Sequence, residues 1–192
     1  KKESIMIHGD LSFIGQYENK NIKKNINFFF NSLKKIVGKK GTIICPAFTY
    51  SFCKNSFFDY QNSPSEVGLF SELFRKRKDT KRTDHPIFSF SIYPKKNSFN
   101  KIDNKTCFGN NSIFHEFHKK NGRIICFGTV PEKSITFFHY IEELAKVKYR
   151  KNKIFKGKIK IKNKFLKTET NYYVRKFLKN TDFKMNKSLE KI

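Results

Sequence analysis

The sequence predicts an α/β fold, a three-layer α/β/α sandwich around a largely parallel or mixed central sheet. Segments with strand and helix signals alternate along the chain, as they do where helices pack on both faces of a sheet. The chain has 192 residues, the size of one domain, and no repeat or low-complexity linker divides it. We therefore expect a single domain over residues 1–192. Because residue 1 is Lys rather than Met, this domain is open to truncation at both ends.

The N-terminal quarter predicts two strands with a helix between them. Ser4–His8 is a short apolar segment typical of a buried strand, and the apolar segment Thr42–Cys45, closed by Pro46, predicts a second. Between them, Gly38 marks the end of a helix. The apolar side chains that recur at helical spacing before this glycine are Ile22, Ile26, Phe29, Phe30, Leu33 and Val37.

The next segment predicts a long loop followed by a helix. Residues 47–61 have no helical period and are rich in aromatic and polar side chains, so we interpret them as a functional loop. Ser63 is suited to cap a helix, Pro64 to occupy its first position, and Glu66 to complete a capping box. The expected buried stripe of this helix is Val67, Phe70, Leu73 and Phe74.

The remainder of the chain continues the alternation. A strand is expected at Ile87–Ile92 and a buried strand at Arg123–Phe127, with a short helix between them that ends near Gly122. A further helix is expected within Ser134–Val147, with Thr136 as its N-cap. From Phe155 to Phe165, apolar and lysine residues alternate, which predicts one half-buried strand with a lysine face.

The formal net charge of +25 favours a polyanionic small ligand over a nucleic acid. There are 41 Lys and Arg residues against 16 Asp and Glu, but the excess is not gathered into one arginine-rich recognition helix. The chain is also rich in Lys, Asn, Ile and Phe, the residue types that an AT-rich coding sequence favours. We therefore expect no nucleic-acid partner.

The same composition argues against a membrane span and a metal site. No apolar run approaches the roughly 20 residues that cross a bilayer, and the apolar start of the chain is broken too early for a signal peptide. The cysteines form no CxxC pair and have no ligand-like spacing with histidine; they are Cys45, Cys53, Cys107 and Cys126. We expect a cytoplasmic protein with reduced thiols and no metal.

His139 and Glu142 are the strongest candidates for chemistry. They lie three residues apart near the start of a predicted helix, so both project from one side of it. The positive end of the helix dipole favours a neutral imidazole, which can take a proton from an amine, and a carboxylate can orient the ring. The alternative is an ordinary polar pair on a helix surface. His85, before Pro86 at a strand entrance, is at a position where a histidine is more often a hydrogen-bonded structural residue than a functional one.

Several segments, taken in order, resemble the aminoglycoside 3-N-acetyltransferase family, especially members similar to polysaccharide-cluster enzymes. The resemblance covers about three quarters of the chain, from Ile5 to about Arg150. The segments are IMIHGDLSFIG, GTIICPAFTYSFC, FFDYQNSPSEVGLFSELFRK, KRTDHPIFSFSI, CFGNNSIF, GRIICFG and SITFFHYIEELAKVKYR. Members of this family usually continue further at the C-terminus.

The resemblance implies direct acetyl transfer from acetyl-CoA to a primary amine of an amino sugar or aminoglycoside, without a covalent enzyme intermediate. The family's threonine–x–x–histidine–x–x–acid segment matches Thr136, His139 and Glu142, and its histidine–proline element matches His85. The family's coenzyme A loop, which approaches the cofactor through backbone amides, matches His8, Gly9, Asp10, Leu11 and Ser12. Gly9 and Asp10 replace the common serine pair, which removes hydroxyl contacts but permits close backbone approach.

We accordingly expect His139 to act as general base and Glu142 to orient it, with Thr136 and His85 in support. The expected acceptor contacts are Phe48 and Tyr50, with Asp59 or Glu66 attracting the ammonium group. Backbone amides near Gly9 or Gly128 are candidate oxyanion donors. Two alternatives remain open, a catalytically silent relative and a basic nucleic-acid-binding module. The acceptor, the length of the acyl chain and the oligomeric state, including a homo-oligomer, also stay open.

Overall fold

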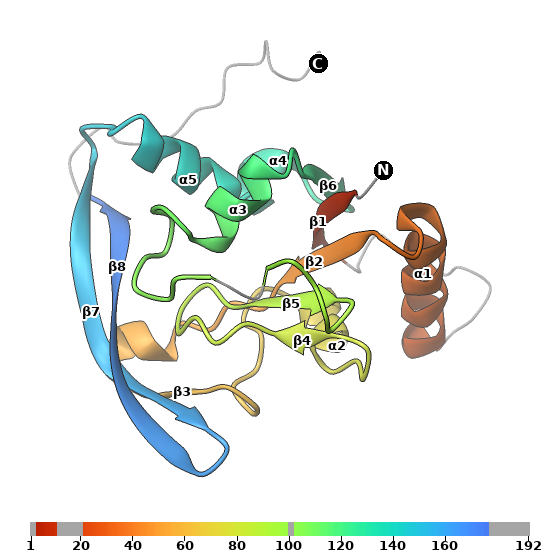
Figure 1. The fold of residues 1–192 in the computed structure, drawn as a ribbon, viewed down its shortest axis with the longest axis horizontal. Helices are drawn as coiled ribbons and strands as arrows, with labels where there is room; N and C mark the ends of the chain where they lie inside the picture. The colour runs from red at the N-terminus through yellow and green to blue at the C-terminus, as the bar shows by residue number, and fades with distance from the viewer. Residues whose placement is uncertain (1–2, 11–20, 100–101, 177–192) are drawn as a thin grey trace.

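A five-stranded mixed sheet in the order β4-β5-β2-β1-β6 forms the centre of the fold (Figure 1). The structure is a computed structural model that describes residues 3–10, 21–99 and 102–176. β1 (Ser4–Gly9) pairs in parallel with β2 (Thr42–Pro46) and β6 (Arg123–Phe127). β5 (Phe90–Tyr93) runs antiparallel to β2, and β4 (Lys81–Arg82) antiparallel to β5. The three parallel strands therefore end at one edge of the sheet.

Helices cover both faces of this sheet, which confirms the predicted α/β/α layering. α1 (Ile22–Val37) and α2 (Leu69–Arg75) pack on one face, where Ile5 and Ile7 of β1 are buried with Phe30 and Phe70. α3 (Ile113–Lys119) and α5 (Phe137–Leu144) contribute to the core on the other face, which Met6 joins. Alternate side chains of β1 thus enter different cores, as the period of a strand requires. α4 (Pro131–Ser134) is a single turn before α5.

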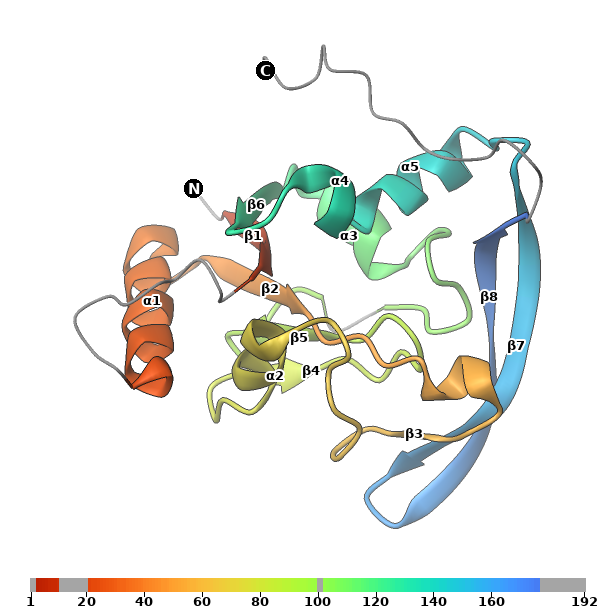
Figure 2. The same cartoon turned by 180° about the vertical axis from the view of Figure 1, so that it is seen from behind.

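A second sheet, in the order β3-β7-β8, lies on the side of the molecule opposite α1 (Figures 1 and 2). β3 (Phe58–Asp59) pairs with the long hairpin formed by β7 (Arg150–Ile161) and β8 (Lys164–Arg175). The prediction of one continuous strand over Phe155–Phe165 is therefore wrong. The chain reverses in a two-residue turn in which Lys162 has a φ of 55°.

The turn also corrects the expected faces of the hairpin. Ile161 pairs with Lys164, so these two residues share a face although one is odd-numbered and the other even-numbered. The alternation is inverted beyond the turn, and Phe165, expected to be half-buried, is 53% exposed. Apolar and lysine residues continue to alternate through the two-residue turn, so the sequence pattern does not reveal that the chain reverses there.

The predicted helix start at Ser63–Glu66 is also wrong, because other parts of the chain take its capping groups. Ser63 accepts the Asp59 N–H at 2.9 Å, and the Glu66 carboxylate accepts the Tyr50 N–H at 2.8 Å. α2 instead begins after Gly68, whose φ of 103° is a conformation that favours glycine. Thr136 precedes α5 as expected but makes no side-chain capping hydrogen bond.

Two strands differ from their predicted form for similar reasons. β5 starts only at Phe90, because the N–H groups of Ile87 and Phe88 are bonded to the His85 side chain. β6 has its predicted bounds but is an edge strand, so its residues alternate between exposed and half-buried rather than being fully buried. The predicted loop over residues 47–61 contains the 3₁₀ turn η2 (Ser51–Lys54) as well as β3.

Candidate active site

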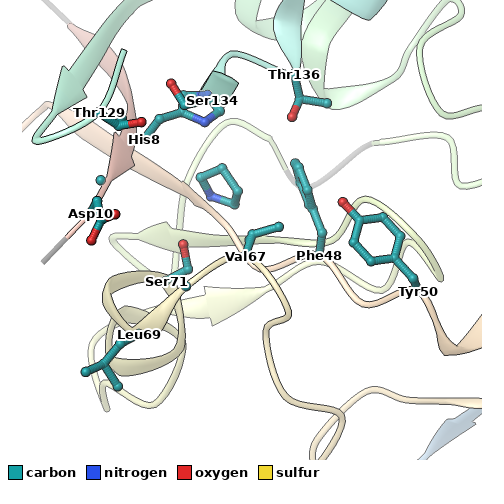
Figure 3. Close-up of a pocket in the computed structure, with 13 residues that line it drawn as sticks. His8, Asp10, Phe48, Tyr50, Val67, Leu69, Ser71, Thr129, Ser134 and Thr136 are labelled. Atoms are coloured by element: carbon teal, nitrogen blue, oxygen red, sulfur yellow. The ribbon is translucent and has the colours of Figure 1, made fainter. Parts of the chain in front are cut away.

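A cleft of about 630 Å³ opens at the carboxyl ends of β1 and β2, beside the start of α2 and the approach to α5 (Figure 3). Ligands of open α/β sheets bind at this kind of edge. Figure 3 shows His8 and Thr129 on one side of the cleft and Tyr50 and Thr136 on the other. The lining residues are His8, Gly9, Asp10, Pro46, Phe48, Tyr50, Val67, Gly68, Leu69, Ser71, Thr129, Ser134 and Thr136.

The cleft gathers many of the residues that the sequence predicts for the site. His8, Gly9 and Asp10 lie at the end of β1, and Phe48, Tyr50 and Thr136 complete the predicted set that lines it. Leu11 and Ser12 lie outside the described residues. Asp59, Glu66, His85, His139 and Glu142 are not among the residues that line the cleft.

The end of β1 forms a tightly packed floor. Asp10 extends the pairing with β6 by donating its N–H to the Phe127 carbonyl at 2.9 Å. A Cβ at position 9 would lie 3.1 Å from the Phe70 ring, so glycine fits the close approach of β1 to α2. Burial lowers the pKa of His8 from 6.5 to about 4. Its Nε2 atom has no hydrogen-bond partner within the part of the chain that the structure describes.

Arg82, a residue that sequence reasoning missed, holds the loop that forms the aromatic wall. Its guanidinium donates to the Ala47 carbonyl at 2.6 Å, the Thr49 hydroxyl at 2.9 Å, the Ser63 carbonyl at 2.5 Å and the Ser89 hydroxyl at 3.0 Å. Only 7% of Arg82 is exposed. Its position in the basic stretch KRTDH gave no signal of burial. These bonds fix both ends of the segment that carries Phe48 and Tyr50.

The two acids expected to attract the acceptor have other partners. Asp59 accepts the N–H groups of Gln61 and Asn62 at 3.0 and 2.9 Å and lies 3.3 Å from the Lys160 ammonium. Although burial alone raises the pKa of Asp59, these hydrogen bonds bring it below its ordinary value. Glu66 is held by the Tyr50 N–H. Both carboxylates therefore stabilise loops, although neither of them lines the cleft.

His139 and Glu142 are brought together as the helical spacing predicts. His139 Nδ1 lies 2.7 Å from Glu142 Oε2. Two further residues complete this group: Tyr149 donates its hydroxyl to Glu142 Oε1 at 2.8 Å, and Arg150 Nε lies 2.8 Å from Glu142 Oε2. Thr136, which lines the cleft, lies one turn before His139 and accepts its N–H at 3.0 Å. His139 and Glu142 thus lie on the helix whose start faces the cleft, and Tyr149 and Arg150 reach them from the chain that follows it.

The surroundings of His139 favour a neutral imidazole. Burial lowers the pKa of His139, the charge of Arg150 lowers it further, and Glu142 opposes both, so that the pKa lies below the ordinary histidine value. The Phe108 ring packs edge-on against the imidazole, with centroids 5.8 Å apart. Sequence reasoning missed Tyr149 and Arg150, because they follow the helix and do not share its periodicity. Both do occur in the matched segment that ends KYR.

His85 is buried, and its side chain accepts hydrogen bonds from backbone N–H groups. Its Nδ1 accepts the N–H groups of Ile87 and Phe88 at 3.1 and 2.9 Å, and its Nε2 lies 3.3 Å from the Thr170 hydroxyl. Burial lowers its pKa from 6.5 to about 4. His85 is thus a neutral residue that joins the strand entrance to β8.

Comparisons with known proteins agree with this architecture. A family model described as aminoglycoside 3-N-acetyltransferase matches residues 6–188. A search of curated protein sequences found no match. Within the described residues, no helix is long and apolar enough to cross a membrane.

Solved structures of low sequence identity share the fold. YokD protein from Bacillus subtilis is 21% identical over 89% of this chain and 74% of that chain, with a TM-score of 0.72. AAC-IIIb, solved with CoASH, is 18% identical over 90% of this chain and 70% of that chain, with a TM-score of 0.75. AAC-VIa bound to sisomicin is 17% identical over 91% of this chain and 70% of that chain, with a TM-score of 0.73. With the family model spanning residues 6–188, the chain belongs to the aminoglycoside 3-N-acetyltransferase family.

Proposed function

We propose that this chain is an acetyl-CoA-dependent N-acetyltransferase that acts on a primary amine of an amino sugar or aminoglycoside. The observation that carries the proposal is a histidine–carboxylate pair one helical turn from the cleft, with Nδ1 and Oε2 2.7 Å apart. Family membership supports acyl transfer. The similarity to AAC-IIIb, solved with CoASH, supports coenzyme A as the carrier of the acyl group.

His139 is the proposed general base of the reaction. As the acceptor nitrogen forms a bond to the thioester carbonyl carbon, Nε2 of His139 takes the proton that the nitrogen loses. The C–S bond then breaks, and the thiolate of coenzyme A leaves with that proton. Glu142 is paired with His139 and stabilises the imidazolium that exists between these two proton transfers.

The proposed contacts with the donor and with the acceptor lie on opposite sides of the cleft. The end of β1 (His8, Gly9 and Asp10) is the proposed donor side, and backbone amides near Gly9 or Gly128 are the proposed oxyanion donors. Phe48 and Tyr50 are the proposed acceptor contacts. The acceptor ammonium is not assigned to Asp59 or Glu66, because neither lines the cleft; both oxygens of Asp59 are engaged, and one oxygen of Glu66 accepts the Tyr50 N–H.

The test is release of coenzyme A thiol from acetyl-CoA with a panel of amino sugars and aminoglycosides. His139→Ala is expected to lower turnover by about 10²–10⁴-fold, the usual contribution of a general base. Glu142→Gln should be milder, and the double variant little worse than His139→Ala, because the two residues act as a unit. His118→Ala, an exposed histidine outside the cleft lining, is the matched control. A folded His139→Ala protein with near-normal turnover would contradict the assignment.

A further inference from the structure

Two groups of opposite charge approach the same nitrogen of His139. Nδ1 lies 2.7 Å from Glu142 Oε2 and 2.8 Å from Arg150 Nη2. A neutral imidazole carries its proton on one nitrogen only. With the proton on Nδ1, the ring donates to Glu142 and Nε2 has a free lone pair. With the proton on Nε2, the ring accepts from Arg150 and Nε2 cannot act as a base.

The contacts around Glu142 favour the first arrangement. The carboxylate is held by the Tyr149 hydroxyl, which donates to Oε1, and by the charge of Arg150, whose Nε lies 2.8 Å from Oε2 without the geometry of a hydrogen bond. If Nδ1 had no proton, its lone pair would face that of Oε2 across 2.7 Å, and the fixed carboxylate could not withdraw. If Nδ1 has the proton, the contact becomes a charge-assisted hydrogen bond. Arg150 Nη2 then loses Nδ1 of His139 as an acceptor. The guanidinium retains its ion pair with Glu142 and its hydrogen bond from Nη1 to the Tyr173 carbonyl at 2.9 Å.

We propose that Arg150 is a positioning residue that fixes Glu142, so that the proton of neutral His139 stays on Nδ1 and Nε2 is left to accept a proton. The guanidinium is suited to this role, since it is buried, is anchored to the β8 backbone by a hydrogen bond from Nη1, and places its charge 2.8 Å from Glu142. The value of this arrangement for acetyl transfer rests on the proposed function. The position of the proton is a property of the resting protein and can be measured without substrate.

The charges around His139 give the proposal a second, independent readout. Glu142, Arg150 and Arg175 are the charged groups that act on the ring. Glu142 favours the imidazolium, whereas the two arginines disfavour it. Removal of Arg150 should therefore raise the pKa of His139, and neutralisation of Glu142 should lower it. These opposite shifts report the charges of the two residues, whereas the position of the proton on the ring reports their geometry.

The experiment is an NMR titration of the protein labelled with ¹⁵N in its histidine rings, with His139 assigned by the loss of its signals in His139→Gln. At neutral pH we expect the Nδ1–H form for His139. Arg150→Met should move its titration to higher pH and Glu142→Gln to lower pH. The acidic limb of the kcat/KM profile should move in the same directions. Arg123→Met, an exposed arginine on the far strand β6, is the matched control and should change neither.

Arg150→Lys separates the charge of the residue from its geometry. Lysine keeps the positive charge but lacks the fork, so the low pKa should persist while the Nε2–H form becomes populated. This variant also carries the test if Arg150→Met does not fold. An Nε2–H ring in the wild-type protein, or an unchanged tautomer in Arg150→Lys, would overturn the proposal. The expected proton position together with full turnover of His139→Ala would instead leave this inference standing and remove the proposed general base.

Discussion

At the scale of single residues, His85 and His139 differ in how many of their ring nitrogens are engaged in hydrogen bonds. Both nitrogens of His85 are engaged, Nδ1 with two backbone N–H groups and Nε2 with Thr170. Among the described residues, His139 has partners only at Nδ1, which are Glu142 and Arg150, and 36% of its side chain is exposed. A histidine with a free, accessible nitrogen can exchange protons with a ligand, whereas one with two satisfied nitrogens stabilises the fold.

This difference predicts how stability depends on pH. The pKa of His85 is about 4 in the folded protein and 6.5 as its ordinary value, so only the unfolded chain takes the proton between these limits. His85 therefore contributes full stability above pH 6.5, and this contribution is lost as pH falls to about 4, at roughly 1.4 kcal/mol per pH unit. His8, with the same lowered pKa, adds a second proton in the same window.

The substitution His85→Asn separates the contribution of His85 to this pH dependence from that of His8. The amide oxygen can replace Nδ1 as acceptor for the Ile87 and Phe88 N–H groups, but it does not titrate in this range. Urea unfolding at several pH values should show that the slope between pH 4 and 6.5 falls by about one proton. An unchanged slope would show that His85 does not titrate as its burial implies.

At the scale of elements, the sequence predicts what is periodic and misses what depends on distant partners. The apolar period of α1 and the run of β6 located these elements to within their observed bounds. The helix start at Ser63 failed because its capping groups bind residues 59 and 50 of the preceding loop. No local pattern records such partners. The same limit applies to the site, where His139 and Glu142 share a helix but Arg150 reaches them from β7.

The loop that precedes α2 is held at both of its ends by Arg82. Arg82 joins Ala47 and Ser63, the two ends of this loop, from the short strand β4. Arg82→Met would leave the Ser63 carbonyl without its donor and the Ala47 carbonyl with the Ser89 hydroxyl alone, and an unsatisfied group costs about 1–3 kcal/mol. We expect a loss of roughly 3 kcal/mol in the free energy of unfolding and a raised KM for the acceptor, because Phe48 and Tyr50 lie on this loop.

Two variants control this prediction. Lys81→Met changes the exposed neighbour on the same strand and should affect neither quantity. Arg82→Lys retains the charge but offers a single point of donation, so it should fall between Arg82→Met and the wild-type protein. Chemical denaturation and steady-state kinetics would measure both effects. Equal stability of Arg82→Met and Lys81→Met would show that the loop is held by other contacts.

At the scale of the whole molecule, the charge of the protein and the character of its cleft differ. The chain carries a net charge of +25, yet no Lys or Arg lines the cleft within the part of the chain that the structure describes. Among the described residues, Asp10 is the only carboxylate in that lining. A polycationic acceptor would approach through a repulsive field and meet one acid, whereas an acceptor that carries phosphate would be attracted. The aromatic wall of Phe48 and Tyr50 can contact a sugar ring in either case.

We therefore expect an amino sugar linked to a nucleotide to be a better acceptor than an aminoglycoside. With acetyl-CoA kept saturating, kcat/KM for the anionic acceptor should fall as salt rises, because screening weakens the attraction. For an aminoglycoside, kcat/KM should rise with salt, since the same screening relieves repulsion. An amino sugar without phosphate serves as the control that shares the ring but lacks the negative charge. Efficient turnover of aminoglycosides, with none of any amino-sugar nucleotide, would overturn this expectation and show that local contacts outweigh the field of the protein.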